Sequence, residues 1–261
     1  MTDRTKLAAT RAEAEPVAED LIESWVQRLA TDVPDAVAVF LKGSFARGDA
    51  APFSDIDFDV IVGGARAAEF PWWLDRLDDR LVHISVTIRG ADDWLGAESE
   101  PASWALGFAA AEATRLMWVR DPDWRRRLDR TALTHPAADP ELEDFVAEFA
   151  KMANARSIGD EVGLRAAAAR LAGYAPGVLR PLNESEDAPI VVASARDALA
   201  VALGLAVMPD GYVEDMLTCL GQRAAGDAEL FDAAHRLVAG TVELVGGDQD
   251  LASYVQQIQR G

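Results

Sequence analysis

The stretch KGSFARGDAAPFSDIDFDVIV, residues 42–62, decides both the fold and the chemistry that this sequence predicts. The apolar run AVAVFLKG at 36–43 predicts a buried strand that ends in a glycine, and IDFDVIVGG at 56–64 predicts a second strand. Between them, Gly43 and Ser44 open a tight turn or short helix. A glycine lets the backbone approach a ligand closely, and a serine hydroxyl with its neighbouring amides can donate hydrogen bonds to an anion. The stretch therefore predicts an anion-binding turn between two strands.

Two aspartates, Asp55 and Asp57, follow this turn two residues apart. Side chains at that spacing on a strand point to the same face, so both carboxylates project together. They repel each other unless a cation lies between them, which predicts a divalent-metal site. A phosphate-binding turn beside such a pair is suited to phosphoryl or nucleotidyl transfer. The alternative of ordinary solvated loop aspartates is disfavoured by the residues that accompany the pair: Gly43, Ser44, Arg47, Gly48 and Ser54.

The sequence outside this stretch predicts an α/β protein with a small mixed sheet domain over 1–132 and an all-helical domain over 136–261. Apolar residues at helical spacing predict a helix over 7–30, which Pro16 either kinks or restarts. The run LVHISVTI at 81–88 predicts a third strand, with His83 on its polar face. PWWLDRLDDR at 71–80 predicts a short helix, and RLMWVRDP at 115–122 predicts a further strand.

The second half of the chain shows mostly helical periodicity after the proline-containing segment THPAADPE at 134–141, which we interpret as a linker. Five helices are expected, followed by a polar tail: near 141–158, 160–184, 190–206, 210–222 and 227–245.

Composition limits the classes of partner. The chain of 261 residues has 44 acidic and 25 basic side chains, for a net charge of −19. We expect no nucleic-acid binding, because the one basic cluster (Arg125, Arg126, Arg127 and Arg130) is broken by acids and predicts a solvated helix face. The negative field favours a cationic small molecule instead.

The cellular compartment is predicted from the single cysteine and from the lack of sequence patterns typical of a secretory signal or a membrane span. Cys219 alone excludes an internal disulfide and indicates a reducing compartment, the cytoplasm. The first twenty residues are charged throughout, so no secretory signal is expected. The longest apolar run, 198–208, is shorter than the roughly 18–20 residues that span a bilayer, so no membrane association is expected.

The segment GSFARGDAAPFSDIDFDV, 43–60, resembles the GSxxxG…SDxD signature of the DNA-polymerase-β-like nucleotidyltransferase superfamily, and the resemblance covers about 37–90. That superfamily includes the small antibiotic nucleotidyltransferases that adenylylate aminoglycosides and lincosamides. The resemblance implies that Gly43 and Ser44 hold the β and γ phosphates of ATP, and that Asp55 and Asp57 bind Mg²⁺ or Mn²⁺. It places Arg47 near the phosphates or in a bracing role within the loop, and Ser54 among the nucleotide-binding residues.

The segment EFAKMANARSIGDEVGLRAAAARLAGY, 148–174, resembles the helical C-terminal domain of kanamycin-type nucleotidyltransferases. In those enzymes one helix carries a glutamate as general base and then a lysine near the phosphates. Lys151 and Asn154 match that pattern, but Ala147 stands where the glutamate belongs and Glu148 is one position out of step. Glu143 and Asp144, one turn earlier, are the alternative bases, and a solvated helix face is the alternative for all three acids.

The third predicted strand departs from the superfamily pattern, which places a third carboxylate there. The equivalent position is His83, and three interpretations remain open. His83 is the catalytic base or an Mn²⁺-type ligand; or an acid of the helical domain replaces the missing carboxylate; or catalysis is reduced and the pocket is kept for binding.

The resemblance and the residues together predict metal-dependent transfer of a nucleoside monophosphate, AMP from ATP, to a hydroxyl of a small molecule such as an aminoglycoside-like antibiotic. The alternative is a catalytically impaired homologue that acts as a nucleotide- or ligand-binding protein. Kanamycin-type relatives build their sites across a dimer, so the resemblance also implies a homodimer.

Overall fold

A computed structural model describes residues 4–51, 54–78, 80–96, 100–139, 142–185, 187–247 and 249–260. The chain divides into two compact units. The first contains Met1–Glu100 and Ala111–His135, and the second contains Pro101–Ala110 and Pro136–Gly261. The bounds 1–132 and 136–261 stay a prediction, and the contacts group residues 101–110 with the second unit.

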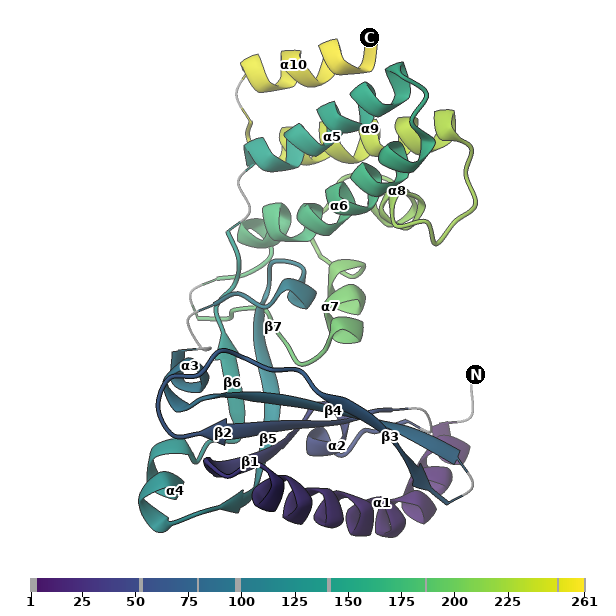
Figure 1. Cartoon of the computed structure of the whole chain (residues 1–261). Coiled ribbons are helices and arrows are strands. Elements are labelled where there is room, and N and C mark those ends of the chain that lie inside the picture. Colours follow the sequence, from purple (N-terminus) through teal and green to yellow (C-terminus); the bar gives the residue numbers. More distant parts are fainter. Residues whose placement is uncertain are drawn as a thin grey trace. The chain divides into compact units, whose positions relative to one another are not determined.

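The first unit is built on one mixed sheet (Figure 1). The strands lie in the order β3-β4-β2-β1-β5-β6; β2 and β4 are parallel, whereas the pairs β1–β2, β1–β5 and β3–β4 are antiparallel. This arrangement, followed by a largely helical second unit, confirms the predicted fold class. The strands are β1 (Ala36–Lys42), β2 (Ile56–Val62), β3 (Trp72–Leu77), β4 (Arg80–Gly90), β5 (Ala109–Val119) and β6 (Ala132–His135).

Two apolar layers cover the sheet of the first unit. Helix α1 (Arg4–Asp32) runs along one face, where Trp25 packs with residues such as Phe58 and Ile84. On the other face, Phe40 stacks on Trp94 of α3 (Ala91–Gly96) with ring centroids 4.5 Å apart. The remaining helices of this unit are the short α2 (Gly43–Arg47) and α4 (Pro122–Leu128). Helix α1 is continuous through position 16, so the helix does not restart at the proline.

The prediction of a helix over 71–80 is wrong, because residues Trp72–Leu77 form strand β3. The side chains alternate along this strand as a half-buried edge requires. Trp73 packs on Trp25 of α1 with ring centroids 5.1 Å apart, and Asp75 accepts a hydrogen bond from the Trp25 indole at 2.8 Å. Both contacts join residues about fifty positions apart, and such long-range packing overrides local helical propensity.

Two further strands differ from the predicted elements. Strand β5 begins at Ala109, six residues before the expected start at 115. Strand β6 includes two residues of the predicted linker, Thr134 and His135, and buries Leu133. Thr114 of β5 donates two hydrogen bonds to the residues just before β6: its amide to the carbonyl of residue 131, and its hydroxyl to the carbonyl of residue 130. These bonds attach the start of β6 to β5.

The second unit is a helical bundle whose core includes Phe149 and Phe231, 5.1 Å apart between ring centroids. Its α-helices are α5 (Leu142–Ser157), α6 (Glu161–Leu179), α7 (Ala195–Ala202), α8 (Tyr212–Cys219), α9 (Asp227–Leu244) and α10 (Gln249–Arg260) (Figure 1). Among its described residues, Ser103–Ala105 and Arg180–Leu182 form short 3₁₀ helices. None of the helices in the described part of the chain combines the length and the apolar character needed to cross a membrane.

Two predictions for the second unit are corrected. The predicted helix over 190–206 is α-helical only at α7. The residues before α7 include the short strand β7 (Val191–Val192), which pairs with Ala109 and Ala110. The expected polar tail is helix α10, which buries Val255 in the bundle. A mostly polar sequence forms this helix because a narrow apolar stripe is enough to attach it to a core.

Candidate active site

A row of polar side chains crosses the sheet of the first unit on the face opposite α1. Asp57 of β2 pairs in register with Lys42 of β1 on one side and with Ser85 of β4 on the other. Lys42 in turn pairs with Thr114 of β5. Residues directly opposite each other on neighbouring strands project to the same face, so Ser85, Asp57, Lys42 and Thr114 form one continuous row.

Asp55 and His83 lie beside this row. The Nδ1 atom of His83 is 3.8 Å from Oδ2 of Asp55, and both side chains are about half exposed. Val82 and Ile84 are buried in the layer against α1, so alternation along β4 directs His83 to the opposite face. The structure thus brings three predicted site residues, Asp55, Asp57 and His83, to one face of the sheet.

The environment of Asp57 favours its protonated form. Partial burial, the neighbouring Asp55 and the more distant Glu112 raise the pKa of Asp57, whereas Lys42 and a hydrogen bond from Ser85 lower it. The net result is a pKa of about 6, well above the ordinary value of 3.8. A bound cation stabilises such a carboxylate more than an isolated one, because the cation also relieves the repulsion between the two neighbouring carboxylates.

Gly43 lies directly against Asp57. Its backbone has φ +65°, a left-handed conformation that side chains disfavour, and a Cβ atom there would lie 2.9 Å from Oδ2 of Asp57. Glycine therefore satisfies two requirements at the start of α2: the backbone turn and the open space beside the carboxylate. Ser44 follows as the second residue of that short helix.

The loop between α2 and β2 is braced by its own side chains. The guanidinium of Arg47 pairs with Asp49, with Nε 3.2 Å from Oδ1. Ser54 closes the turn before Asp55: its hydroxyl accepts a 2.8 Å hydrogen bond from the Ala51 amide, and its own amide donates to the Ala51 carbonyl. The Arg47 contact corresponds to the bracing role, which was one of the two alternatives for this residue. The Ser54 contacts stabilise the turn that directly precedes Asp55.

A buried group of charges behind the pair was not predicted from the sequence. Asp59 is fully buried, accepts a hydrogen bond from Arg89 and lies 3.5 Å from Nζ of Lys42. The same ammonium lies 3.3 Å from Oε1 of Glu112 on β5. Asp59 carries a sequence signal, since it continues the spacing of Asp55 and Asp57 along one strand face. Glu112 carries none, because only the pairing of β5 with β1 brings it here.

The donor set fits a divalent cation that also binds phosphate. Mg²⁺ in nucleotide enzymes is held by one or two carboxylates, with the substrate phosphates and water completing its shell. Asp55 and Asp57 supply such a pair, and the missing Cβ of Gly43 leaves room at Oδ2 of Asp57. In the described ranges, no group of three or more histidine, cysteine or acidic side chains is placed to hold a metal ion.

The predicted residues of the second unit form a separate ion cluster. Glu148 is buried on α5, and its two oxygens accept from Lys151 at 2.6 Å and from Arg170 of α6 at 2.9 Å. The carboxylate therefore ties α5 to α6, and Lys151, expected near the phosphates, is bound to Glu148. Glu143 and Asp144, the alternative bases, are exposed in the first turn of α5.

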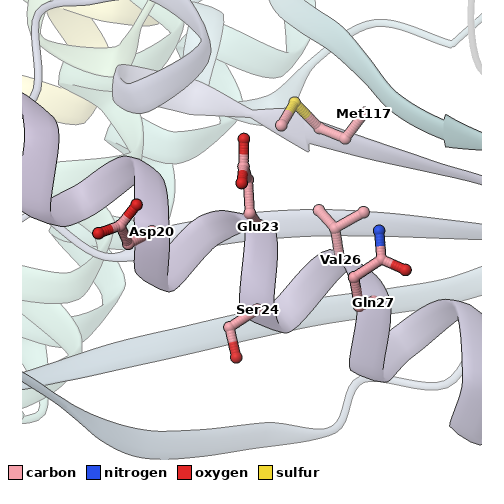
Figure 2. Close-up of a pocket in the computed structure, with 6 residues that line it drawn as sticks. All are labelled: Asp20, Glu23, Ser24, Val26, Gln27 and Met117. Atoms are coloured by element: carbon pink, nitrogen blue, oxygen red, sulfur yellow. The ribbon is translucent and has the colours of Figure 1, made fainter.

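A shallow depression in the first unit lies apart from these residues (Figure 2). Five of its six lining residues come from α1, and the sixth is Met117 of β5, which packs in the layer against α1. It therefore lies on the opposite face of the sheet from Asp57 and contains none of the predicted site residues.

Comparisons with known proteins identify the two parts of the chain by family. No curated protein matches the chain. One similar solved structure is a nucleotidyltransferase-like protein from Exiguobacterium sibiricum, with 13% sequence identity and a TM-score of 0.37; the match covers 90% of this chain and 78% of that one.

The family model described as a nucleotidyltransferase domain matches residues 22–98, and the model described as a nucleotidyltransferase substrate-binding domain matches residues 141–247. The first match contains Gly43, Asp55, Asp57 and His83, and the second contains Glu148. The chain thus contains a nucleotidyltransferase domain followed by a nucleotidyltransferase substrate-binding domain.

Proposed function

We propose that this protein transfers a nucleoside monophosphate, AMP from ATP, to a hydroxyl group of a small molecule and releases pyrophosphate. The observation that carries the proposal is the Asp55–Asp57 pair on one sheet face, with Gly43 packed against Asp57 at the start of α2. The order of the two matched domains supports a small-molecule acceptor, since the second is a substrate-binding domain.

In this proposal each residue of the first unit has a defined task. Asp55 and Asp57 hold the divalent cation, Mg²⁺ or Mn²⁺, which neutralises triphosphate charge when bound. Gly43 and Ser44 receive the distal phosphates, and the Arg47 and Ser54 contacts fix the loop that presents Asp55. The acceptor oxygen bonds to the α-phosphorus as the bond to pyrophosphate breaks, and a base takes the hydroxyl proton.

His83 is the base that this unit offers. Its imidazole is half exposed beside Asp55, and when neutral it has one nitrogen able to accept a proton. Its Nδ1 atom lies 3.8 Å from Oδ2 of Asp55, so the ring is next to the carboxylate pair. Glu148 is the alternative base, but it is already engaged by two cations.

The acceptor that we propose is cationic and resembles an aminoglycoside. The chain carries a net charge of −19, which attracts polyamines over several ångströms at physiological ionic strength. A cytoplasmic location and a homodimer complete the proposal, the latter by analogy with kanamycin-type enzymes. Sedimentation of the purified chain tests the dimer directly.

A second candidate function is metal-dependent nucleotide binding without transfer. It is favoured by the imidazole at the position where the superfamily has a third carboxylate, because two carboxylates hold the cation with less charge than three. Both functions predict nucleotide binding, and they differ in whether a covalent product forms.

The experiment follows the α-phosphate. The purified protein is incubated with α-³²P-labelled ATP, Mg²⁺ or Mn²⁺ and a panel of aminoglycosides, and products are separated chromatographically. Labelled acceptor that forms only with metal, persists in Asp93→Asn and is lost in Asp57→Asn supports transfer; Asp93 is an exposed acid of α3. Metal-dependent nucleotide binding without labelled product supports the second candidate. A chain that binds no nucleotide with either metal contradicts both.

A further inference from the structure

The hairpin of β3 and β4 exposes large apolar side chains at the edge of the sheet. Trp72 is 62% exposed, Leu74 58% and Leu81 60%, in a unit that buries most side chains of this kind. Exposed apolar side chains that gather in one place on a monomer mark a binding surface more often than chance would give.

The fold itself does not require Trp72. Its neighbour Trp73 makes the packing contact with α1, and Asp75 makes the hydrogen bond to that helix. Trp72 projects to the other face, which carries the candidate active site, because it pairs in register with Ser85. The side chain therefore adds exposed apolar area to the site face without closing a core.

Trp72 extends the polar row of the site by one position. The extended row consists of Trp72 of β3, Ser85 of β4, Asp57 of β2 and Lys42 of β1. Since neighbouring strands lie about 4.8 Å apart, Trp72 and Asp57 start from backbones about 10 Å apart on one face. The indole also lies beside His83, with ring centroids 5.6 Å apart, and His83 in turn contacts Asp55.

We propose that Trp72 is the stacking platform for the nucleobase of the nucleoside triphosphate whose phosphates bind at Asp55 and Asp57. This inference rests on the proposed function. In a nucleotide, one ribose separates the flat base from the 5′ phosphates, so a base partner belongs one ribose away from the metal-binding pair. The backbone separation of about 10 Å between Trp72 and Asp57 is compatible with that spacing. An indole face stacks on any nucleobase.

The competing occupants fit this position less well. A polycationic acceptor would be attracted to Asp55 and Asp57 themselves. Next to Trp72 on the same strand face lie the apolar Leu74 and the cation Arg76, neither of which attracts a polycation. A second copy of a chain with charge −19 would have to overcome mutual repulsion to dock there. Both are nevertheless distinguishable outcomes of the test.

The test compares two ligands that differ by the nucleoside. Calorimetry measures the binding of α,β-methylene-ATP and of inorganic tripolyphosphate, each with Mg²⁺, to the wild type, Trp72→Ala, Trp72→Phe and the control Leu81→Ala. We expect Trp72→Ala to reduce the affinity for α,β-methylene-ATP by roughly tenfold or more and to leave the affinity for tripolyphosphate unchanged. Trp72→Phe should retain most of the nucleotide affinity, and Leu81→Ala should bind as the wild type does.

The outcomes separate this inference from the proposed function. If wild type binds both ligands and Trp72→Ala changes neither affinity, or weakens both equally, the platform is overturned while the proposed function stands. If Trp72→Ala instead raises only the KM of the acceptor, or changes only the sedimentation coefficient, the surface belongs to the acceptor or to a second copy, which also overturns it. If wild type binds neither ligand, the proposed function and the inference both fail.

Discussion

Lys42 of β1 and Asp59 of β2 form an ion pair beneath the candidate site, with Nζ 3.5 Å from Oδ1. Burial acts to lower the pKa of Lys42, but Asp59 and Glu112 raise it more, so the ammonium stays charged. Lys42 also pairs in register with Asp57. The pair therefore fixes one positive charge next to Asp57, and part of the charge balance of the candidate site is built into the sheet.

Removing the Asp59 carboxylate should destabilise the fold strongly. Asp59→Ala leaves Lys42 and Arg89 without their buried partner, which typically costs about 3–5 kcal/mol in the free energy of unfolding. Urea denaturation followed by circular dichroism measures this loss. The matched control is Asp32→Ala, which breaks the exposed Arg28–Asp32 pair and should cost less than about 1 kcal/mol. Equal losses for the two variants would show that the buried pair contributes no more than a surface one.

Replacing Asp57 should stabilise the metal-free protein in a pH-dependent way. The folded-state pKa of about 6 exceeds the ordinary value of 3.8, so ionisation of Asp57 costs free energy of folding. That cost is absent below pH 3.8, grows as the pH rises through 6 and is complete above it. In EDTA at pH 7.5, Asp57→Asn should raise the Tm by about 2–4 °C, and the gain should shrink towards pH 4.

The control for this prediction is Asp93→Asn, whose Tm difference from the wild type should not follow that pH dependence. Addition of Mg²⁺ or Mn²⁺ should raise the Tm of wild type but not that of Asp57→Asn, since the variant has lost a ligand of the proposed site. A Tm for Asp57→Asn below that of wild type at every pH would contradict the electrostatic picture.

Substitutions of His83 distinguish a base from a bystander. His83→Glu places a carboxylate beside Asp55, so Mn²⁺ affinity should increase about tenfold or more and the metal-free Tm should fall. His83→Ala should leave metal affinity within about twofold. If His83 is the base, His83→Ala should reduce turnover by about 100-fold or more. Unchanged metal affinity and turnover in both variants would mean that His83 takes no part.

Glu148 should act mainly on the stability of the helical unit. Glu148→Gln keeps the shape but removes the charge that binds Lys151 and Arg170, which should cost about 1–3 kcal/mol in unfolding free energy. Glu143→Gln, an exposed acid of the same helix, should cost less than about 0.5 kcal/mol. Turnover that falls about 100-fold or more in Glu148→Gln, with little loss of stability, would instead identify Glu148 as the general base.

Elements whose signals are local could be predicted from the amino-acid sequence. Alternation at period two is a property of a single strand, so the common face of Asp55 and Asp57, and the direction of His83, follow from residues a few positions apart. The left-handed turn at Gly43 and most helices of the second unit have equally local signals, in backbone freedom and in apolar spacing.

Which strands are neighbours, and hence which charges meet, depends on long-range packing. Residues 71–80 have a plausible helical pattern, yet they form an edge strand because Trp73 and Asp75 find their partners on α1. Glu112 reaches Lys42, and Trp72 joins the row of Asp57, through strand pairings between segments tens of residues apart. Such pairings depend on register and on burial of the whole sheet, and no short stretch of sequence contains that information.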